Sequence, residues 1–370
     1  MKVTVHPAAA WPKIAPIWDA LVRAAPDASF FMSVHWTGTW LEVFGEQLQP
    51  QILVFESGGE VLGACLLVAR SERRGPLTWR RVHFNTAGED EADSACIELN
   101  GLLCRAGAER EVVAALWAHL ESEDWDEFVI EAAAESSTLQ CFEDSGARTT
   151  KDRYEFVRRS RANHYVCLRD IDKPEIGYER HLSRNTREQV RRSLKLYEQS
   201  GEIAVESAAS AARALEMMSE LADLHQRVWT ARGRPGVFAS ARFRTFHSTL
   251  IQRAFPAGHI QVLRVATATQ TIGLLYNFVW RGKVSFYQSG LHYSDDNRFK
   301  PGLIAHVLAI QQACASGCGE YDFLAGESRY KASLANAERT MVWATWQRPG
   351  PKLQLRTLLR RLKSGTRLLR

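Results

Sequence analysis

Residues 284–331 read VSFYQSGLHYSDDNRFKPGLIAHVLAIQQACASGCGEYDFLAGESRYK, and this stretch decides the fold. An apolar strand (284–291) precedes a polar loop, and a second apolar strand begins near Glu320. Between them, Pro301-Gly302 opens a long apolar run, and proline in the first turn is a favourable helix start. The order strand, polar loop, helix, strand predicts an α/β unit.

Two cations stand directly before this helix start. Arg298 and Lys300 flank Phe299, and Pro301-Gly302 follows. The first N–H groups of a helix lack intrahelical acceptors, and the helix dipole places partial positive charge at the same end. The pattern therefore predicts a site for a phosphate or pyrophosphate built from Arg298, Lys300, Pro301 and Gly302.

The same stretch resembles the acyl-CoA-binding core of the GNAT acyltransferase superfamily. The combination of RFKPG (298–302), YDFLAGE (321–327) and a final YK (330–331) is similar to the FemAB-like branch, which includes CelD-like acetyltransferases associated with cellulose and exopolysaccharide synthesis. The resemblance covers Leu182 to about Trp346. It implies acetyl-CoA or another acyl-CoA as the donor. Lys331 is a candidate partner of a donor phosphate or of Glu327, and the alternative is an exposed ammonium.

Length and composition indicate an ordinary globular protein. The 370 residues are enough for two domains, with 45% hydrophobic and 24% charged residues and a net charge of +5. The seven cysteines are odd in number and form no CxxC pair, which favours reduced thiols over disulfides or a zinc site. The sequence opens without an apolar signal core, and no run reaches the roughly 20 apolar residues that span a bilayer. We expect a cytoplasmic protein.

The first half of the chain repeats the pattern of strands and helices of the second half in a less complete form. A hairpin pattern at 51–70 returns at 260–280, so that Gly63 aligns with Gly273. A strand, a helix and another strand follow in both halves. The sequence therefore predicts two tandem GNAT-like α/β domains, each a mixed, mostly antiparallel sheet flanked by helices. The alternative is chance matching of short apolar strings.

The predicted division is 1–165 for a degenerate N-terminal domain, 166–350 for the donor-binding domain and 351–370 for a basic tail. Before its helix the first copy has Arg105-Ala106-Gly107-Ala108, with one cation and no proline, and the YK ending is missing. We expect only the C-terminal copy to bind an acyl donor.

Two basic segments have alternative interpretations. The segment 178–195 is either a solvated helix face or a surface for a polyanion such as tRNA. Residues 351–370 carry seven cations, no acid and interleaved leucines. That tail suits an anionic membrane surface or an acidic partner, or it is a docked or disordered end.

Acyl transfer from a thioester needs a deprotonated acceptor, a stabilised oxyanion and a protonated leaving thiolate, but no covalent nucleophile. Asp322 and Glu327 are the candidate bases, although a lone acid in a strand usually has a structural partner. Tyr330 and Tyr287 are the candidate proton donors to the thiolate.

Three further residues are candidates for the acceptor side. Gln288 and His292 lie at the end of the 284–291 strand and are candidates for orienting the acceptor; His292 is otherwise the base or an ordinary loop histidine. Trp229 is either a wall of the acceptor pocket or part of the core. The eleven histidines show no HExxH spacing, and we expect no metal. Neither a Walker motif nor a GxGxxG follows a strand, which argues against ATP hydrolysis and dinucleotide redox chemistry.

The sequence thus predicts an acyl-CoA-dependent N- or O-acyltransferase. By resemblance its acceptor is a small molecule, glycan or peptide of envelope or exopolysaccharide metabolism, reached from the cytoplasm or the inner membrane surface. One rival is an aminoacyl-tRNA-dependent transferase, which alone among these readings requires a nucleic acid. Another is an inactive scaffold of a membrane-surface synthase complex.

Overall fold

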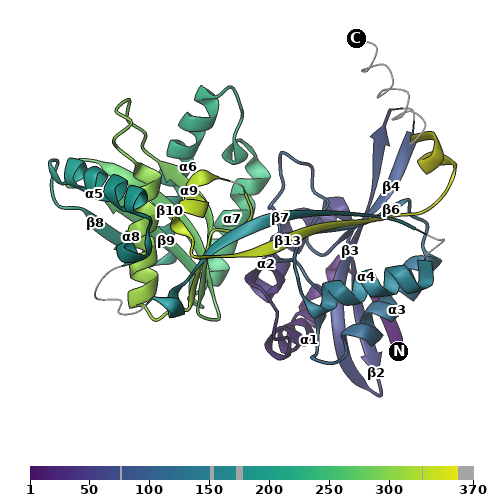
Figure 1. The fold of residues 1–370 in the computed structure, drawn as a ribbon. Coiled ribbons are helices and arrows are strands. Elements are labelled where there is room, and N and C mark those ends of the chain that lie inside the picture. Colours follow the sequence, from purple (N-terminus) through teal and green to yellow (C-terminus); the bar gives the residue numbers. More distant parts are fainter. Residues whose placement is uncertain (76, 151–153, 172–177, 327, 357–370) are drawn as a thin grey trace, which may run out of the picture. The chain divides into compact units, whose positions relative to one another are not determined.

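The computed structural model, drawn in Figure 1, describes residues 1–75, 77–150, 154–171, 178–326 and 328–356. The chain divides into two compact units. The first comprises Met1–Asp90, Ser94–Ser160 and Met341–Arg370, and the second comprises Glu91–Asp93 and Arg161–Thr340. Strands β7 (Glu155–Cys167) and β13 (Ala337–Gln347) lead the chain from one unit into the other. The sequence division placed 341–350 with the second domain, whereas these residues lie in the first unit.

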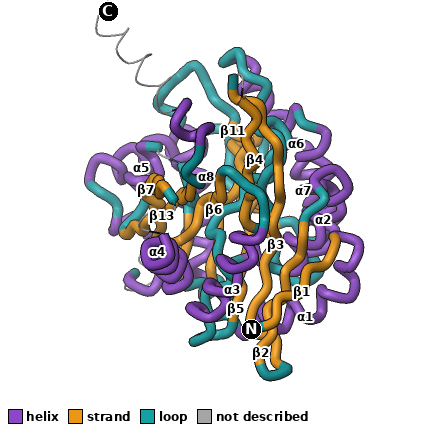
Figure 2. Tube along the Cα trace, turned by 90° about the vertical axis from the view of Figure 1, so that its right-hand side faces the viewer, coloured by secondary structure: helices purple, strands orange, loops and turns teal. Residues whose placement is uncertain are grey.

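The first unit is a sheet with helices. Its described elements are β1 (Lys2–Pro7), α1 (Trp11–Ala24), α2 (Val34–Leu48), β2 (Gln51–Ser57), β3 (Glu60–Arg74), β4 (Leu77–Phe84), β5 (Leu103–Cys104), α3 (Glu109–Ser122), β6 (Glu127–Ala134) and α4 (Ser137–Thr150). The strand order is β1-β2-β3-β4-β6-β13, and Figure 2 shows the first five of these strands side by side. All neighbours are antiparallel except β4 and β6, which are parallel.

The core of the first unit is aromatic. Trp117 of α3 packs edge-on against Phe128 of β6 and Trp346 of β13, with ring centroids 5.6 and 5.4 Å away. Trp346 is 2% exposed. The last strand of the chain therefore supplies part of the first unit's core, which accounts for its place in that unit.

The second unit repeats this plan. Its described helices and strands are α5 (Arg184–Glu198), β8 (Ala204–Ser207), α6 (Ala211–Ala231), α7 (Ala241–Ala254), β9 (Ile260–Ala266), β10 (Thr271–Trp280), β11 (Lys283–Leu291), α8 (Pro301–Ala315), β12 (Glu320–Asp322) and α9 (Arg329–Leu334). Short 3₁₀ turns lie at Leu168–Asp170, Tyr178–His181 and Val237–Ala239. The strand order is β7-β12-β11-β10-β9-β8, with β11 and β12 parallel. Helices α5 and α8 share one buried cluster with the sheet, and α6 and α7 cover the other face.

The predicted internal repeat is confirmed. In each unit a hairpin, a strand, a helix and a parallel strand follow in the same order. A Cβ atom on Gly63 would lie 2.9 Å from Val112 of α3, and one on Gly273 would lie 2.7 Å from Leu291 and 3.8 Å from Ala305 of α8. Glycine at this shared position lets the second hairpin strand come close to its neighbours in both copies.

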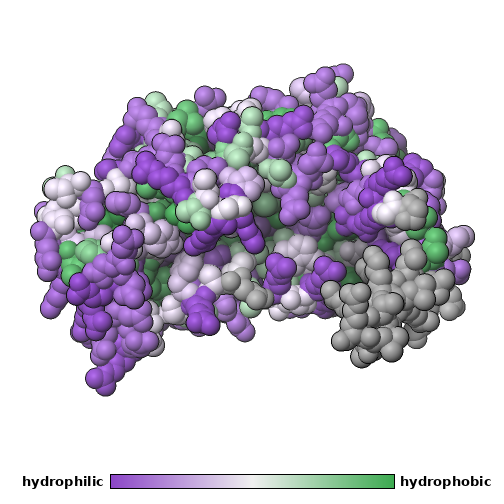
Figure 3. Space-filling view, turned by 90° about the horizontal axis from the view of Figure 1, so that it is seen from above, coloured by the Kyte–Doolittle hydropathy of each residue, from purple (hydrophilic) through white to green (hydrophobic). Residues whose placement is uncertain are grey.

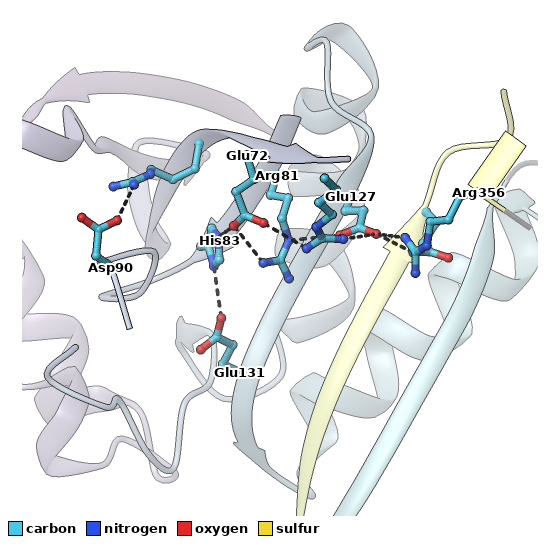
Figure 4. Close-up of polar contacts among 10 residues, drawn as sticks. Glu72, Arg81, His83, Asp90, Glu127, Glu131 and Arg356 are labelled. Carbon is cyan, nitrogen blue, oxygen red and sulfur yellow. Dashed lines mark hydrogen bonds and ion pairs between the residues drawn. The ribbon is translucent and has the colours of Figure 1, made fainter. Parts of the chain in front are cut away.

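A buried acid joins strands of the first unit, as Figure 4 shows. Glu127 is 2% exposed. Its carboxylate lies 3.1 Å from Arg74, 3.0 Å from Nε of Arg81 and 2.6 Å from Arg356, and it accepts a 2.5 Å hydrogen bond from Gln347. Several hydrogen-bonded partners are what a buried carboxylate requires.

The molecular face drawn in Figure 3 is mainly hydrophilic, with hydrophobic residues in small scattered groups. None of the described helices combines the length and the apolar character needed to cross a membrane.

Candidate functional site

A pocket of about 820 Å³ opens at the start of α8 in the second unit. Its walls come from α5, the end of β11, the loop to α8, the first turn of α8, and α9. The described lining residues are Asn185, Thr186, Gln189, Leu291, Tyr293, Ser294, Asn297, Phe299, Lys300, Pro301, Gly302, Leu303, Arg329, Tyr330 and Ser333. None of these is acidic, and Lys300 and Arg329 give the pocket positive charge.

Local contacts fix this helix start. The backbone N–H of Lys300 donates to Oγ of Ser193 in α5 at 2.9 Å, and Pro301 has no N–H. A Cβ on Gly302 would lie 3.1 Å from Cδ1 of Leu291, so glycine allows β11 and α8 to meet here. The N–H groups of Gly302 and Leu303 are the first-turn donors that helix geometry leaves without an intrahelical acceptor. They are available to an anion in the pocket.

An open strand edge leads toward the same pocket. Strands β11 and β12 pair only through Lys283–Glu320, Val284–Tyr321 and Ser285–Asp322. β12 then ends, whereas β11 continues to Leu291, which lines the pocket. Within the described chain, β11 beyond Ser285 therefore has no strand partner on this side. Such an edge offers backbone N–H and C=O groups to an extended ligand.

Tyr330 lies in the pocket wall and is backed by a buried histidine. Its ring stacks on His306 of α8 with centroids 5.3 Å apart. Nδ1 of His306 lies 3.0 Å from the hydroxyl of Tyr321. Burial, and secondly the charge of Lys331, lowers the pKa of His306 to about 3, so the imidazole is neutral. Burial raises the pKa of Tyr330, which keeps its hydroxyl protonated at neutral pH.

Lys331 points away from the pocket lining. Only 8% exposed, its ammonium donates to the carbonyl oxygens of Phe323 and Ala325 at 2.8 Å each. These carbonyls belong to the turn after β12, where Leu324 has a left-handed φ of 55°. Lys331 therefore ties this turn to α9, and its predicted pairing with a donor phosphate or with Glu327 stays a prediction.

The two predicted cations before α8 are separated. Lys300 lines the pocket, whereas Arg298 is exposed and does not. Nε and Nη2 of Arg298 bind the carboxylate of Asp296 at 2.9 and 2.6 Å. Their mutual hydrogen bonds raise the pKa of Arg298 and lower that of Asp296 to about 2.

Of the two predicted bases, the structure describes Asp322 but not Glu327. Asp322 is 1% exposed; Oδ1 accepts from the N–H of Leu324 at 2.8 Å, and Oδ2 lies 3.3 Å from Nη2 of Arg339. Burial raises the pKa of Asp322, while Arg339 acts in the opposite direction. Asp322 is absent from the pocket lining; Oδ1 has a backbone donor, whereas Oδ2 has the charge of Arg339 beside it but no hydrogen bond within the described chain. Glu327 lies outside the described residues.

The remaining predicted residues are not gathered at this pocket. Tyr287 packs against His247 and Phe278, each with ring centroids 4.9 Å away, on the face covered by α6 and α7. Trp229 of α6 packs beside His225 at 5.7 Å. Gln288 is half-buried in β11, and His292 is exposed with its backbone N–H bound to the carbonyl of Ile272 at 3.0 Å. The role of Tyr287 as a proton donor and the assignment of Gln288, His292 and Trp229 to the acceptor side stay predictions.

Sequence reasoning missed the residues that support the site. His306 and Ser193 appeared only as members of helical runs, and Asn185 and Gln189 only as polar residues of a basic helix. Helical spacing could have placed Ser193 on the buried face of α5 together with Thr186, Val190 and Tyr197. No local signal tells which of these side chains meets α8.

The equivalent position in the first unit is closed. After β4 and β6 separate, Asn100 lies beside β6, bridged to Ala133. Its side chain donates to the carbonyl of Phe84 at 3.2 Å and accepts from Asn85 at 2.8 Å. The first turn of α3 carries Glu109 and Glu111, whereas that of α8 carries no acid. Acids at a helix start oppose an anion there.

The comparison with protein families agrees with this geometry. Residues 184–332 match the family described as acetyltransferase (GNAT) domain. The matched segment contains the α8 pocket, the β11 edge and Tyr330, so the pocket lies within the part of the chain that resembles this family. No curated protein sequence matches the chain.

Solved structures share the fold over nearly the whole chain. The structure of FemX is 12% identical and covers 93% of this chain and 97% of its own, with a TM-score of 0.58. The C-terminal domain of a protein described as a lysylphosphatidylglycerol synthetase from Agrobacterium fabrum is 9% identical, covers 95% and 96%, and has a TM-score of 0.55. L-PGS from Bacillus licheniformis is 11% identical, covers 87% and 90%, and scores 0.51. At such identities the likeness shows the fold alone, which is the predicted tandem GNAT-like, FemAB-like α/β fold.

Metal chemistry has no obvious site. In the described part of the chain, no group of three or more His, Cys, Asp or Glu side chains is arranged to hold a metal ion.

Proposed function

We propose that the second unit transfers an acyl group, most simply acetyl, from an acyl-CoA to an amine or hydroxyl of an acceptor. The observation that carries this proposal is the pocket at the start of α8, which meets the open edge of β11. The CoA pyrophosphate binds the N–H groups of Gly302 and Leu303 beside Lys300. The pantetheine arm, an extended chain with two amides, pairs with β11 beyond Ser285.

The chemistry then requires little more from the protein. The acceptor atom attacks the thioester carbon, the carbon–sulfur bond breaks, and the thiolate takes a proton from Tyr330. The acceptor proton goes to a base, for which Asp322 and Glu327 are the candidates. The partners of Asp322 favour a structural role for it. Comparing the pH–rate profiles of Asp322→Asn and Glu327→Gln identifies the base. Only the variant that lacks the base loses the fall in rate at low pH.

The donor site is confined to the second unit in this proposal. Asn100 fills the equivalent gap in the first unit, and Glu109 and Glu111 oppose an anion at its helix start. The first unit instead supports the fold and contributes to acceptor recognition. The acceptor class follows from the resemblance: a small molecule, glycan or peptide of envelope or exopolysaccharide metabolism. We place the reaction in the cytoplasm, with the basic tail at the inner membrane surface.

Calorimetric titration tests the donor. The protein is titrated with acetyl-CoA, a long-chain acyl-CoA and free CoA, and the same is done for Lys300→Ala and Arg298→Ala. Because Lys300 lines the pocket and Arg298 does not, Lys300→Ala weakens binding about tenfold, whereas Arg298→Ala leaves it nearly unchanged. No binding of any of the three ligands overturns the proposal. Equal losses in both variants would restore the predicted two-cation site.

A second donor class has its own supporting observation. Arg187, Arg192 and Lys195 of α5 have no acidic partner within the described chain, and Asn185 and Gln189 of the same helix line the pocket. A polyanionic donor such as aminoacyl-tRNA would use this surface. It predicts tRNA binding that weakens steeply with salt and shows a smaller salt slope in Arg192→Ala. Acyl-CoA binding shows little dependence on Arg192.

A further inference from the structure

A second pocket lies in the second unit between α6 and α7. It measures about 490 Å³, which suits a small molecule. Its apolar walls include Leu215, Met218 and Phe238, and its polar residues include Asp223, Arg244 and His247. None of these residues lines the α8 pocket. The chemistry proposed above uses none of them.

The walls of this pocket are tied in place. Nε2 of Gln226 in α6 donates to the carbonyl of Pro235 at 2.6 Å. Nη1 of Arg244 in α7 donates to the carbonyl of Phe238, and lies 3.3 Å from that of Ala239. Both residues thus hold the segment that closes one end of the groove. The pocket is a built feature of the fold and not a gap under a free loop.

His247 is the residue that the fold leaves unexplained. It lines the pocket and is 1% exposed, yet neither ring nitrogen has a hydrogen-bond partner in the described chain. The hydroxyl of Tyr276, whose ring lies 5.5 Å away, is also buried without a partner. A polar group that is buried without a hydrogen-bond partner destabilises the folded state. Such a cost is understandable where a ligand supplies the missing hydrogen bonds.

The chemistry of the site narrows the ligand. Burial lowers the pKa of His247 to about 3, so the ring is neutral and offers one donor and one acceptor. A hydroxyl or a carboxamide can both donate and accept in return. A carboxylate can only accept, and the neutral imidazole offers it no charge; in the same lining Asp223 opposes it, and Arg244 is engaged by the carbonyls of Phe238 and Ala239. The apolar walls suit a body that carries such a group.

We propose that the groove between α6 and α7 binds a small uncharged ligand whose hydroxyl or carboxamide pairs with His247. This site is separate from the acyl-donor pocket. It touches the same sheet, because His247 packs on Tyr287 of β11. The inference does not depend on the identity of the acyl donor.

Benzamide and benzoate are matched probes, because they share one shape and differ in charge and in the ability to donate. N-acetylglucosamine is a second uncharged probe, with both hydroxyls and an amide. Each is added to full-length protein labelled with ¹⁵N-histidine, and the ring signals are followed. We expect benzamide to shift the His247 signals with a Kd of about 1 mM and benzoate to bind at least about tenfold more weakly.

Substitutions complete the test. His247→Phe removes both unpaired nitrogens while filling the space, so it raises the urea midpoint and weakens benzamide about tenfold or more. His247→Gln keeps a donor and an acceptor and retains part of the affinity. His259→Phe, a histidine outside the pocket, leaves benzamide binding unchanged. Titration of His247→Phe with acetyl-CoA tests separately whether the variant still binds the acyl donor.

The opposite results are equally definite. The proposal fails if the uncharged probes leave the His247 signals unchanged at about 20 mM, far above the expected Kd. It also fails if benzoate binds as well as benzamide, or if His247→Phe binds benzamide normally. If the unmodified protein does not bind acetyl-CoA, the proposed function is overturned, but the proposal of a ligand site at His247 is unaffected.

Discussion

The phenol ring of Tyr330 stacks on the imidazole of His306, with their planes 20° apart and their centroids separated by 5.3 Å. Tyr330 faces the pocket from α9, and His306 supports it from α8. A second contact fixes His306 in turn, because its Nδ1 lies 3.0 Å from the hydroxyl of Tyr321. Strand β12, helix α8 and helix α9 therefore meet at one aromatic stack.

The first prediction concerns the Tyr330 hydroxyl. Tyr330→Phe keeps the stack and removes the proton donor, so kcat for acyl transfer falls about 100-fold while the Kd for acetyl-CoA is unchanged. Tyr293→Phe, a tyrosine that lines the same pocket, alters neither value. Because burial raises the Tyr330 pKa, the unmodified enzyme loses no activity to this group below about pH 10. Equal kcat in both variants would assign the thiolate proton to another source.

A second prediction separates a structural lysine from a phosphate ligand. Lys331→Met leaves the carbonyls of Phe323 and Ala325 without their charged donor, at a cost of about 3 kcal/mol in the free energy of unfolding. Urea denaturation measures this loss, and Lys300→Met serves as the control that keeps its stability. If Lys331→Met kept full stability and instead lost affinity for acyl-CoA, the role predicted from sequence, a ligand of the donor phosphate, would be supported.

The third prediction is the pH dependence of the first unit. His83 is 4% exposed, with Nδ1 at 3.1 Å from Glu131 (Figure 4). Burial opposes its charge, but hydrogen bonds to Glu131 and Glu72 outweigh that effect and raise the His83 pKa. A raised folded pKa gives stability that is complete below about pH 6.5 and is lost as pH rises through the folded value.

His83→Gln therefore lowers the free energy of unfolding by about 1 kcal/mol at pH 5.5 and has less effect at pH 9. The Glu131 pKa behaves inversely: burial would raise it, but the His83 contact lowers it, so its contribution is lost as pH falls below about 4. Denaturant titrations across this range, with His6→Gln as a control at a half-buried histidine of β1, measure the difference. A His83→Gln effect that is the same at both pH values would remove His83 from this role.

The fourth prediction divides the basic tail at residue 356. Lys352 lies 2.8 Å from Asp126, and Arg356 lies 2.6 Å from the buried Glu127, so these two cations are engaged by the first unit. Arg356→Ala destabilises the protein by about 1–2 kcal/mol, because Glu127 loses a partner. The later residues of the predicted amphipathic tail lie outside the described chain.

Deleting 357–370 tests the membrane hypothesis without disturbing those pairs. This deletion should reduce the fraction of the protein that sediments with anionic liposomes. The urea concentration at the midpoint of unfolding should stay the same. Arg356→Ala should behave in the opposite way, losing stability and keeping liposome binding. If the intact protein does not sediment with anionic liposomes, the tail has no such role.

Local signals in the sequence determined the elements and their order. Pro301-Gly302 marks the start of α8, the Ser57-Gly58-Gly59 turn marks the β2–β3 hairpin, and the repeated pattern predicts the second copy. These signals act within a few residues, because turn geometry and side-chain periodicity depend on neighbours along the chain. They were sufficient for the tandem fold and for the position of the α8 pocket.

Tertiary structure alone decided the partners. Nothing local indicates that Met341–Gln347 pairs with β6, or that Lys300 faces the pocket while Arg298 turns to Asp296. The burial of Lys331 and of His247 was not predicted from the sequence, and neither were the partners that surround them. Those partners come from segments far apart in sequence, and their hydrogen bonds and charges exist only once the sheet and helices have packed.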